Sequence, residues 1–183
     1  MSFRSPAITA AAMAAALFAV PTSASAATCS GGEVVPTQSN AATVRHATLC
    51  LLNQQRAAHG LGKLRESGKL RSAAQGYTWA MVRHDFFDHV SPGGSTLLRR
   101  VRSTAYLASA RGWALGENIA WGAGPRATPT ATVRAWMHSA GHRHNILTRR
   151  FDEIGIGVVP GAPVDLPAGM NAATYTTDFG TRG

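Results

Sequence analysis

The run GENIAWG (Gly116–Gly122) is followed, after a short intervening segment, by WMHSAGHRHNIL (Trp136–Leu147). The first run carries one carboxylate, that of Glu117, and the second carries three histidines, within stretches whose apolar residues favour a protein core. Acidic residues are scarce in this chain, with 9 Asp and Glu against 18 Lys and Arg. Because polar groups inside a core need partners, the two runs together predict a buried polar site.

The first 26 residues have the three parts of a secretory signal peptide. One positive charge, Arg4, precedes an apolar, Ala-rich stretch from Ala7 to Val20, and a run of small residues follows at 23–27. The apolar stretch has about 14 residues, whereas a membrane-spanning helix needs about 20. We therefore expect residues 1–26 to be removed on export, which predicts a secreted, extracellular protein with no transmembrane segment after cleavage.

The mature chain keeps two cysteines, Cys29 and Cys50. An even number of cysteines in an oxidising compartment favours a disulfide. This bridge would attach residues 27–40, predicted to be an extended lead-in without periodicity, to the first helix. A reactive thiol is disfavoured because the chain has no Cys-x-x-Cys spacing.

About 157 residues remain after cleavage, enough for one domain with its own core, which we place at residues 41–183. Loss of Arg4 lowers the formal net charge from +9 to +8. A basic exported protein meets anionic cell-envelope components first. A nucleic-acid partner is disfavoured because the basic residues form no run and do not alternate with aromatic residues. The basic residues expected on the solvated surface include Arg99, Arg100, Arg102, Arg149 and Arg150.

Helical periodicity predicts two amphipathic helices in the first half of the domain. The first follows Asn40, a favourable N-cap residue, and ends at Gly60, with Arg56 on its polar face. The second follows Ser67 and carries one apolar stripe that faces the core. The stripe consists of Leu70, Ala73, Ala74, Tyr77 and Met81.

Further helices are predicted on either side of GENIAWG. After a Pro-Gly-Gly turn, Ser95 is expected to cap a short helix, and Phe86 and Phe87 before the turn are expected in the core. Thr128, followed by a proline, starts a later helix that must stop or bend near Gly141.

Two strands are predicted near the C-terminus, at residues 153–159 (EIGIGVV) and 173–180 (ATYTTDFG), and GENIAWG is strand-like as well. Gly155 and Gly157 leave room for a close neighbour on one face of their strand. The order of helices and strands favours the α/β class, a single layered domain in which helices cover an antiparallel sheet.

Two catalytic patterns in the second run are incomplete. His138 and His142 have the spacing of a zinc-binding helical pair, but Ser139 stands where the metalloprotease pattern has Glu. Ser139 and His142 could form part of a serine hydrolase site, but the chain has no G-x-S-x-G elbow. Neither pattern by itself predicts an enzyme.

Six motifs in a fixed order resemble the CAP superfamily, also called the SCP domain, and its bacterial secreted members above all. This superfamily includes the cysteine-rich secretory proteins, antigen 5 and pathogenesis-related 1 proteins. The motifs are LNQQRAAHGL, FFDHVSPGGS, GENIAWG, WMHSAGHRHNIL, FDEIGIGV and TTDFG. The resemblance implies a single-domain α-β-α sandwich with a central antiparallel sheet between helical layers.

The resemblance also implies a central cleft with two histidines and acidic residues, which in some members bind a divalent metal ion. Carried onto this chain, the histidines are His89 and His142, and the first acid is Glu117. The second acid falls on Ser139. A Zn²⁺ or Ca²⁺ ion held by His89 and His142 would therefore have one negative charge fewer beside it and would bind more weakly or rely on water.

Three functions stay open. We prefer a secreted binding module whose His/Glu-lined cleft holds a small apolar or glycan ligand or a cell-envelope component, since lipid and sterol binding is proposed for members that the chain resembles. The second is a metal-dependent, peptidase-like hydrolase with Glu117 as candidate general base. The third is a non-catalytic envelope adhesion protein. Glu117 and the histidines could equally form a hydrogen-bond network that only fixes the fold.

Overall fold

A four-stranded sheet in the order β1-β3-β4-β2 lies at the centre of the fold. Its strands are β1 (Arg65–Glu66), β2 (Trp113–Ala123), β3 (Glu153–Pro160) and β4 (Ala172–Arg182). Strands β2, β3 and β4 pair antiparallel, which confirms the expected sheet, whereas β1 adds a parallel pair at the β3 edge. The sequence analysis missed β1 because two residues are too short for a periodic pattern.

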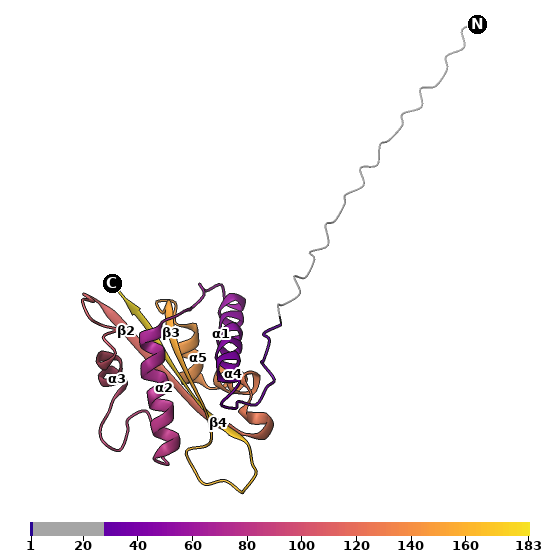
Figure 1. The fold of residues 1–183 in the computed structure, drawn as a ribbon. Coiled ribbons are helices and arrows are strands. Elements are labelled where there is room, and N and C mark those ends of the chain that lie inside the picture. The colour runs from indigo at the N-terminus through magenta and orange to yellow at the C-terminus, as the bar shows by residue number, and fades with distance from the viewer. Residues whose placement is uncertain (2–27) are drawn as a thin grey trace.

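The computed structural model describes Met1 and residues 28–183 (Figure 1). The predicted signal peptide, residues 1–26, lies outside the described residues apart from Met1. None of the helices in the described part combines the length and the apolar character that a membrane span requires.

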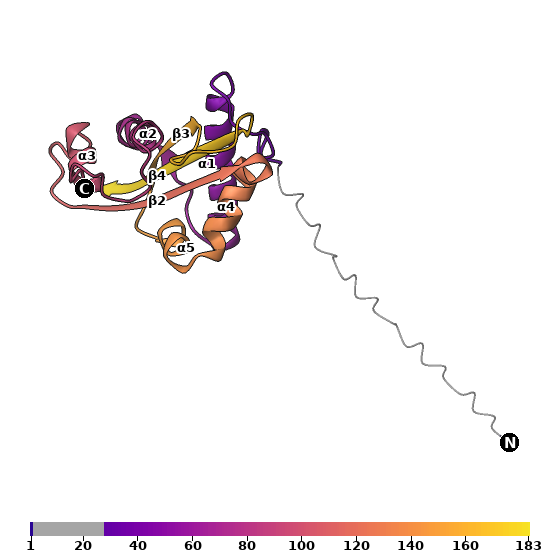
Figure 2. The same cartoon turned by 90° about the horizontal axis from the view of Figure 1, so that it is seen from below.

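Helices cover both faces of the sheet. Helices α2 and α3 lie on one face, and α4 and α5 lie on the other, with α1 packed against α4 (Figure 2). This arrangement confirms the α-β-α sandwich. The bounds are α1 Ala41–Ala58, α2 Gly68–Arg83, α3 Leu97–Ser103, α4 Pro129–His138 and α5 Ala140–Leu147, with a short 3₁₀ helix, Gly124–Ala127, between β2 and α4.

Two apolar cores lie on opposite sides of the sheet. The larger one is formed by the inner faces of α1, α4 and α5 against the sheet, and Trp136 and Phe179 are among its fully buried side chains. On the other side, the predicted stripe of α2 is buried, which confirms its assignment to the core. Phe86 is half-buried against Tyr77, but Phe87 is exposed, so its assignment to the core is wrong.

Gly155 and Gly157 bring β3 directly against the backbone of α2. A Cβ atom on Gly155 would lie 2.0 Å from the carbonyl carbon of Leu70, and one on Gly157 would lie 2.5 Å from the carbonyl oxygen of Ala74. These distances are far inside van der Waals contact. The close neighbour predicted from the two glycines is therefore α2.

The N-cap of α3 differs from the prediction, whereas the break expected near Gly141 is present. The N-cap of α3 is Thr96, whose hydroxyl accepts a hydrogen bond from the Arg99 amide, and not Ser95. The break after α4 falls at Ser139, which has extended backbone angles of φ −102° and ψ 122°, and Gly141 lies inside α5.

The predicted disulfide between Cys29 and Cys50 is present, with 5.7 Å between the two Cα atoms. It ties the segment before α1 to the middle of that helix. Residues 28–40 contain turns but no helix or strand. The bridge restricts the unfolded chain and so stabilises the fold, by about 3 kcal/mol for a loop of this size.

Arg56 is buried, with 1% of its surface exposed, so its placement on the polar face of the first helix is wrong. Its guanidinium donates hydrogen bonds to four backbone carbonyl groups. The acceptors are Gly62 at 2.7 Å, Ile146 at 2.8 Å, Thr148 at 3.0 Å and Phe151 at 2.9 Å. Carbonyl groups at a helix end lack hydrogen-bond donors within the helix. Here Arg56 of α1 provides the donors for carbonyl groups at and after the end of α5.

Replacement of Arg56 by Met should keep the apolar stem but leave these buried carbonyl groups without donors. We expect the free energy of unfolding to fall by roughly 3 kcal/mol or more, because each unsatisfied buried acceptor costs about 1–3 kcal/mol. Urea unfolding of Arg56→Met against wild type measures this loss. The matched control is Arg83→Met on the exposed end of α2, and an equal, small effect in both variants would contradict the role of Arg56.

Candidate functional site

The candidate site wraps around β2, which is an edge strand with only β4 as its neighbour. Successive side chains of a strand point to opposite faces of the sheet. Glu117 therefore points toward the α2 and α3 layer, and Asn118 points toward α5. Because β2 lies at the edge of the sheet, segments that pass outside the sheet can contact it on both faces.

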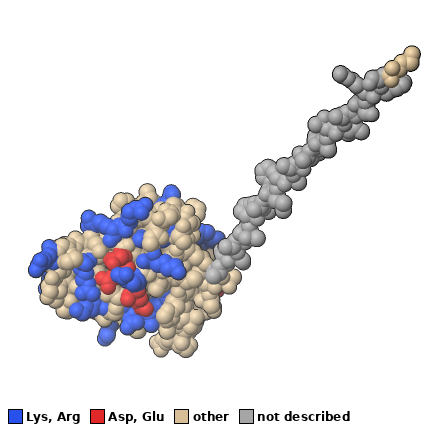
Figure 3. All heavy atoms as spheres, turned by 90° about the horizontal axis from the view of Figure 1, so that it is seen from above, with Lys and Arg blue, Asp and Glu red and all other residues tan. Residues whose placement is uncertain are grey.

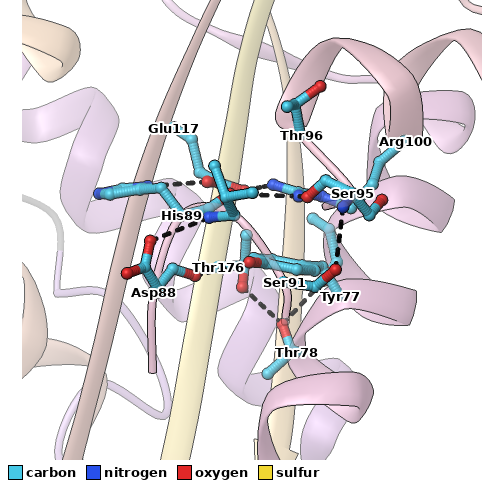
Figure 4. Close-up of polar contacts among 12 residues, drawn as sticks. Tyr77, Thr78, Asp88, His89, Ser91, Ser95, Thr96, Arg100, Glu117 and Thr176 are labelled. Carbon is cyan, nitrogen blue, oxygen red and sulfur yellow. Dashed lines mark hydrogen bonds and ion pairs between the residues drawn. The ribbon is translucent and has the colours of Figure 1, made fainter. Parts of the chain in front are cut away.

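On the α2 side, Glu117 forms a buried ion pair with Arg100 of α3. Nη2 of Arg100 donates to Oε2 of Glu117 at 2.5 Å, and the two side chains are 8% and 3% exposed. The guanidinium also lies over the ring of Tyr77, with Cζ 3.3 Å from the ring centroid (Figure 4). The sequence analysis placed Arg100 on the solvated surface. That assignment is wrong, because a buried carboxylate requires a charged partner.

The second oxygen of Glu117 is bound by His89. Nδ1 of His89 lies 2.8 Å from Oε1 of Glu117, and in Figure 4 the carboxylate lies between the imidazole and the guanidinium. The opposite edge of the imidazole faces outward, and 53% of the side chain is exposed. Both carboxylate oxygens therefore have positively charged or proton-donating partners.

The loop that carries His89 is held by the same side chains. Nη1 of Arg100 donates to the carbonyl groups of His89 at 3.2 Å and Ser95 at 2.7 Å. The hydroxyl of Tyr77 donates to the carbonyl of Asp88 at 2.6 Å. The loop thus depends on α2 and α3 for its position, and through them His89 is aligned with Glu117.

On the other face of β2, an amide network joins the strand to α5. Nδ2 of Asn145 donates to the carbonyl of Glu117 and to Oδ1 of Asn118, both at 2.9 Å. Nδ2 of Asn118 donates to the carbonyl of His142 at 3.1 Å. The ring of His142 lies beside that of Trp136, with 6.4 Å between the centroids. The backbone of His142 is therefore held against β2 by Asn118, and its ring lies beside Trp136.

The two histidines have pKa values shifted in opposite directions. The hydrogen bond to Glu117 raises the pKa of His89 above its usual value. Burial lowers the pKa of His142, and the positive charge of His89 lowers it further. His89 therefore holds its proton more readily than His142 does.

Asp178 of β4 is a buried acid that the sequence analysis did not assign. It pairs with Glu117 in the sheet register, is fully buried, and neither carboxyl oxygen has a hydrogen-bond donor among the described residues. Burial raises its pKa well above the usual value, and the negative charge of Glu117 adds to the shift. In its protonated form Asp178 can donate a hydrogen bond to Glu117, which stays ionised.

The structure brings together three of the four residues expected in the cleft. His89 contacts Glu117 directly, and His142 lies close enough to sense the charge of His89. Ser139 is half-buried at the junction of α4 and α5, and its hydroxyl does not cap α5. His138 and His144 are exposed on their helices.

The residues that the sequence analysis missed are Arg100, Tyr77, Asn118, Asn145 and Asp178. Asn118 lies in GENIAWG and Asn145 in WMHSAGHRHNIL, so their positions in these motifs could have marked them as site residues. Arg100 and Asp178 come from segments whose proximity to Glu117 depends on how α3 and β4 pack.

The described side chains do not fit a resident divalent metal ion. Both oxygens of Glu117 are engaged by Arg100 and His89, and no group of three or more His, Cys, Asp or Glu side chains in the described part could hold an ion. His89 and His142 as metal ligands remain a prediction.

Replacement of Asp178 by Asn should stabilise the protein at neutral pH. An Asp with a raised pKa keeps its proton in the folded state, whereas the unfolded chain releases it above about pH 3.9, so stability falls as the pH rises from there. Asn cannot ionise, and its amide can still donate to Glu117. We expect a gain on the order of 1 kcal/mol at pH 7, seen as a rise in Tm of roughly 2–4 °C.

Thermal unfolding of wild type and Asp178→Asn between pH 4 and pH 8 measures this difference. The stabilisation should grow with pH and shrink toward pH 4. Asp165→Asn, at an exposed position, is the matched control. A variant less stable than wild type at pH 7 would show that Asp178 is ionised in the folded protein.

Comparison with known sequences places the chain in one protein family. The model of the cysteine-rich secretory protein family, CAP, matches residues 49–166. The uncharacterized protein YkwD of Bacillus subtilis (strain 168) is 34% identical over 114 residues, which cover 62% of this chain and 42% of YkwD. The uncharacterized membrane protein YlbC of the same organism is 32% identical over 112 residues, 60% of this chain and 30% of YlbC. The chain thus spans less than half the length of these relatives.

Solved structures share the fold. An extracellular protein containing a SCP domain from Bacillus anthracis str. Ames superimposes with a TM-score of 0.58 at 24% identity, over 79% of this chain and 44% of that one. An outer surface protein from Borrelia burgdorferi gives 0.55 at 20% identity, over 72% and 87%. The family match covers more than half of the 183 residues. This protein belongs to the CAP family of cysteine-rich secretory proteins.

Proposed function

We propose that this protein is an extracellular, non-catalytic binding module that holds an anionic group of a cell-envelope component at the His89–His142 site. Several features support the extracellular location. The first 26 residues follow the pattern of a signal peptide, and the domain contains a disulfide. A structural neighbour of the same fold is an extracellular protein.

The occupancy of Glu117 is the observation that carries this proposal. The Glu117 side chain is only 3% exposed, and each of its oxygens already binds Arg100 or His89, so the carboxylate is not presented to a ligand that approaches from solvent. The group that the site presents to solvent is instead the outer edge of the His89 imidazole. A cationic, exposed N–H donor favours anions such as phosphate or carboxylate.

The charge distribution of the domain supports the same ligand class. Lys and Arg side chains are spread over the face shown in Figure 3, and the acidic side chains visible there are gathered in one place. The whole chain has a formal charge of +9. Such a surface attracts polyanions over a distance, which raises the rate of encounter without fixing where they bind.

An anionic ligand also accounts for the arrangement better than a lipid or sterol held at the same site. His89 is held in place by Glu117, Arg100 and the loop contacts of Tyr77, so its outer nitrogen is presented in a fixed direction. Fixed donors lose little conformational entropy on binding. A neutral apolar ligand would gain nothing from the raised pKa of His89.

We expect inorganic phosphate to bind at this site in a pH-dependent manner. The Cε1–H resonances of His89 and His142, followed by NMR, should shift saturably on phosphate addition at pH 6, and His89→Gln should abolish the shift at His142. Because the folded pKa of His89 lies above about 6.5, binding should persist near that pH and weaken as the pH rises through the folded pKa.

His84→Gln, at the exposed end of α2, is the matched control and should bind phosphate as wild type does. Calorimetric titration with Zn²⁺ forms the second arm. Saturable Zn²⁺ binding that His89→Ala and His142→Ala each abolish, with no response to phosphate, would refute the anion site in favour of the metal site.

A further inference from the structure

A groove of about 830 Å³ runs between the start of α1, the outer face of α2 and the end of β3. It lies at the β3 side of the sheet, whereas the His89–His142 site lies at the opposite edge, on β2. We propose that this groove binds a segment of an acidic polysaccharide. The two proposals use different residues, and neither depends on the other.

An exposed tryptophan and an unpaired arginine line the groove. The indole of Trp79 is 49% exposed on α2, and its N–H has no hydrogen-bond partner among the described residues. The guanidinium of Arg45 on α1 likewise forms no hydrogen bond or ion pair within the described part. Exposed aromatic rings and arginines are both common in binding sites.

The charge of the groove selects an anion. Arg71 lines it together with Arg45, and none of the described residues that line it is acidic. Arg71 contacts Glu66 at 3.3 Å outside the groove, but 46% of its side chain remains exposed and its other donors are free to bind a ligand. Guanidinium groups bind carboxylate and sulfate groups through paired hydrogen bonds.

Gly76 keeps the groove open beside Trp79. Glycine inside a helix costs about 0.5–1 kcal/mol relative to alanine. Nothing in the packing requires it here, because a Cβ atom would meet no other atom within 4 Å. Gly76 and Ser72 also line a second hollow of about 310 Å³ on the other side of α2. The small residues Ser72 and Gly76 therefore border both hollows.

The strand edge in the groove is closed to a peptide. A bound peptide strand would need free backbone groups on β3. The side-chain amide of Gln75 already donates to the carbonyl of Val158 at 3.2 Å and accepts from its amide at 3.1 Å. Pro160 has no N–H to offer. The ligand is thus recognised by side chains, which favours sugar rings, whose apolar faces stack on an indole, with acidic substituents on the arginines.

The test is calorimetric titration of the mature protein with a heparin-derived hexasaccharide and with neutral maltohexaose. We expect saturable binding of the acidic hexasaccharide and none of maltohexaose. Trp79→Ala should weaken binding roughly tenfold, as expected for loss of an aromatic anchor, and Arg45→Gln should weaken it severalfold.

Gly76→Gln provides a variant that fills the groove without unfolding the protein. Glutamine is a better helix former than glycine, so Tm should be unchanged or higher while hexasaccharide binding is lost. Trp113→Ala, at another exposed tryptophan, should bind the hexasaccharide as wild type does. Binding that survives both Trp79→Ala and Gly76→Gln, or equal binding of maltohexaose, would overturn the proposal.

Discussion

The buried pair of Glu117 and Arg100 is the interaction on which the rest of the site depends. An ionised carboxylate that is 3% exposed would be strongly destabilising without a partner, and removal of one member of such a pair leaves the other charge uncompensated. Arg100 meets this need while it stacks on Tyr77 and binds the carbonyl groups of the His89 loop. One guanidinium therefore connects α2, α3, β2 and the loop.

The order of helices and strands could be predicted from the sequence because a local pattern indicates each of them. The apolar stripe of α2, the alternation in β3 and the proline after Thr128 each specify their element from neighbouring residues alone. The errors at Arg56 and Arg100 arose because these side chains act over a long distance in sequence. Arg56 and Arg100 look like surface arginines in their own helices, and only the fold brings carbonyl groups or a carboxylate to them.

The site itself was predicted in part for the same reason. The family resemblance indicated His89, Glu117 and His142, but it placed the second acid at Ser139. Asp178 is an acid beside Glu117 on the neighbouring strand, and burial raises its pKa. No spacing in a single sequence reveals that register, because it depends on the pairing of β2 with β4, two strands far apart in the chain.

The contact of α2 with Gly155 and Gly157 has a consequence for how the protein can vary. Because Gly155 and Gly157 have no side chain, α2 lies directly against the sheet. The inner side of this helix carries Tyr77, and its outer side carries Trp79. A side chain at either glycine would push the whole of α2 away from the sheet and so disturb the sites at both edges of the sheet. Substitutions are therefore tolerated in the loops at each edge of the sheet, but not at the two glycines that set the distance between α2 and the sheet.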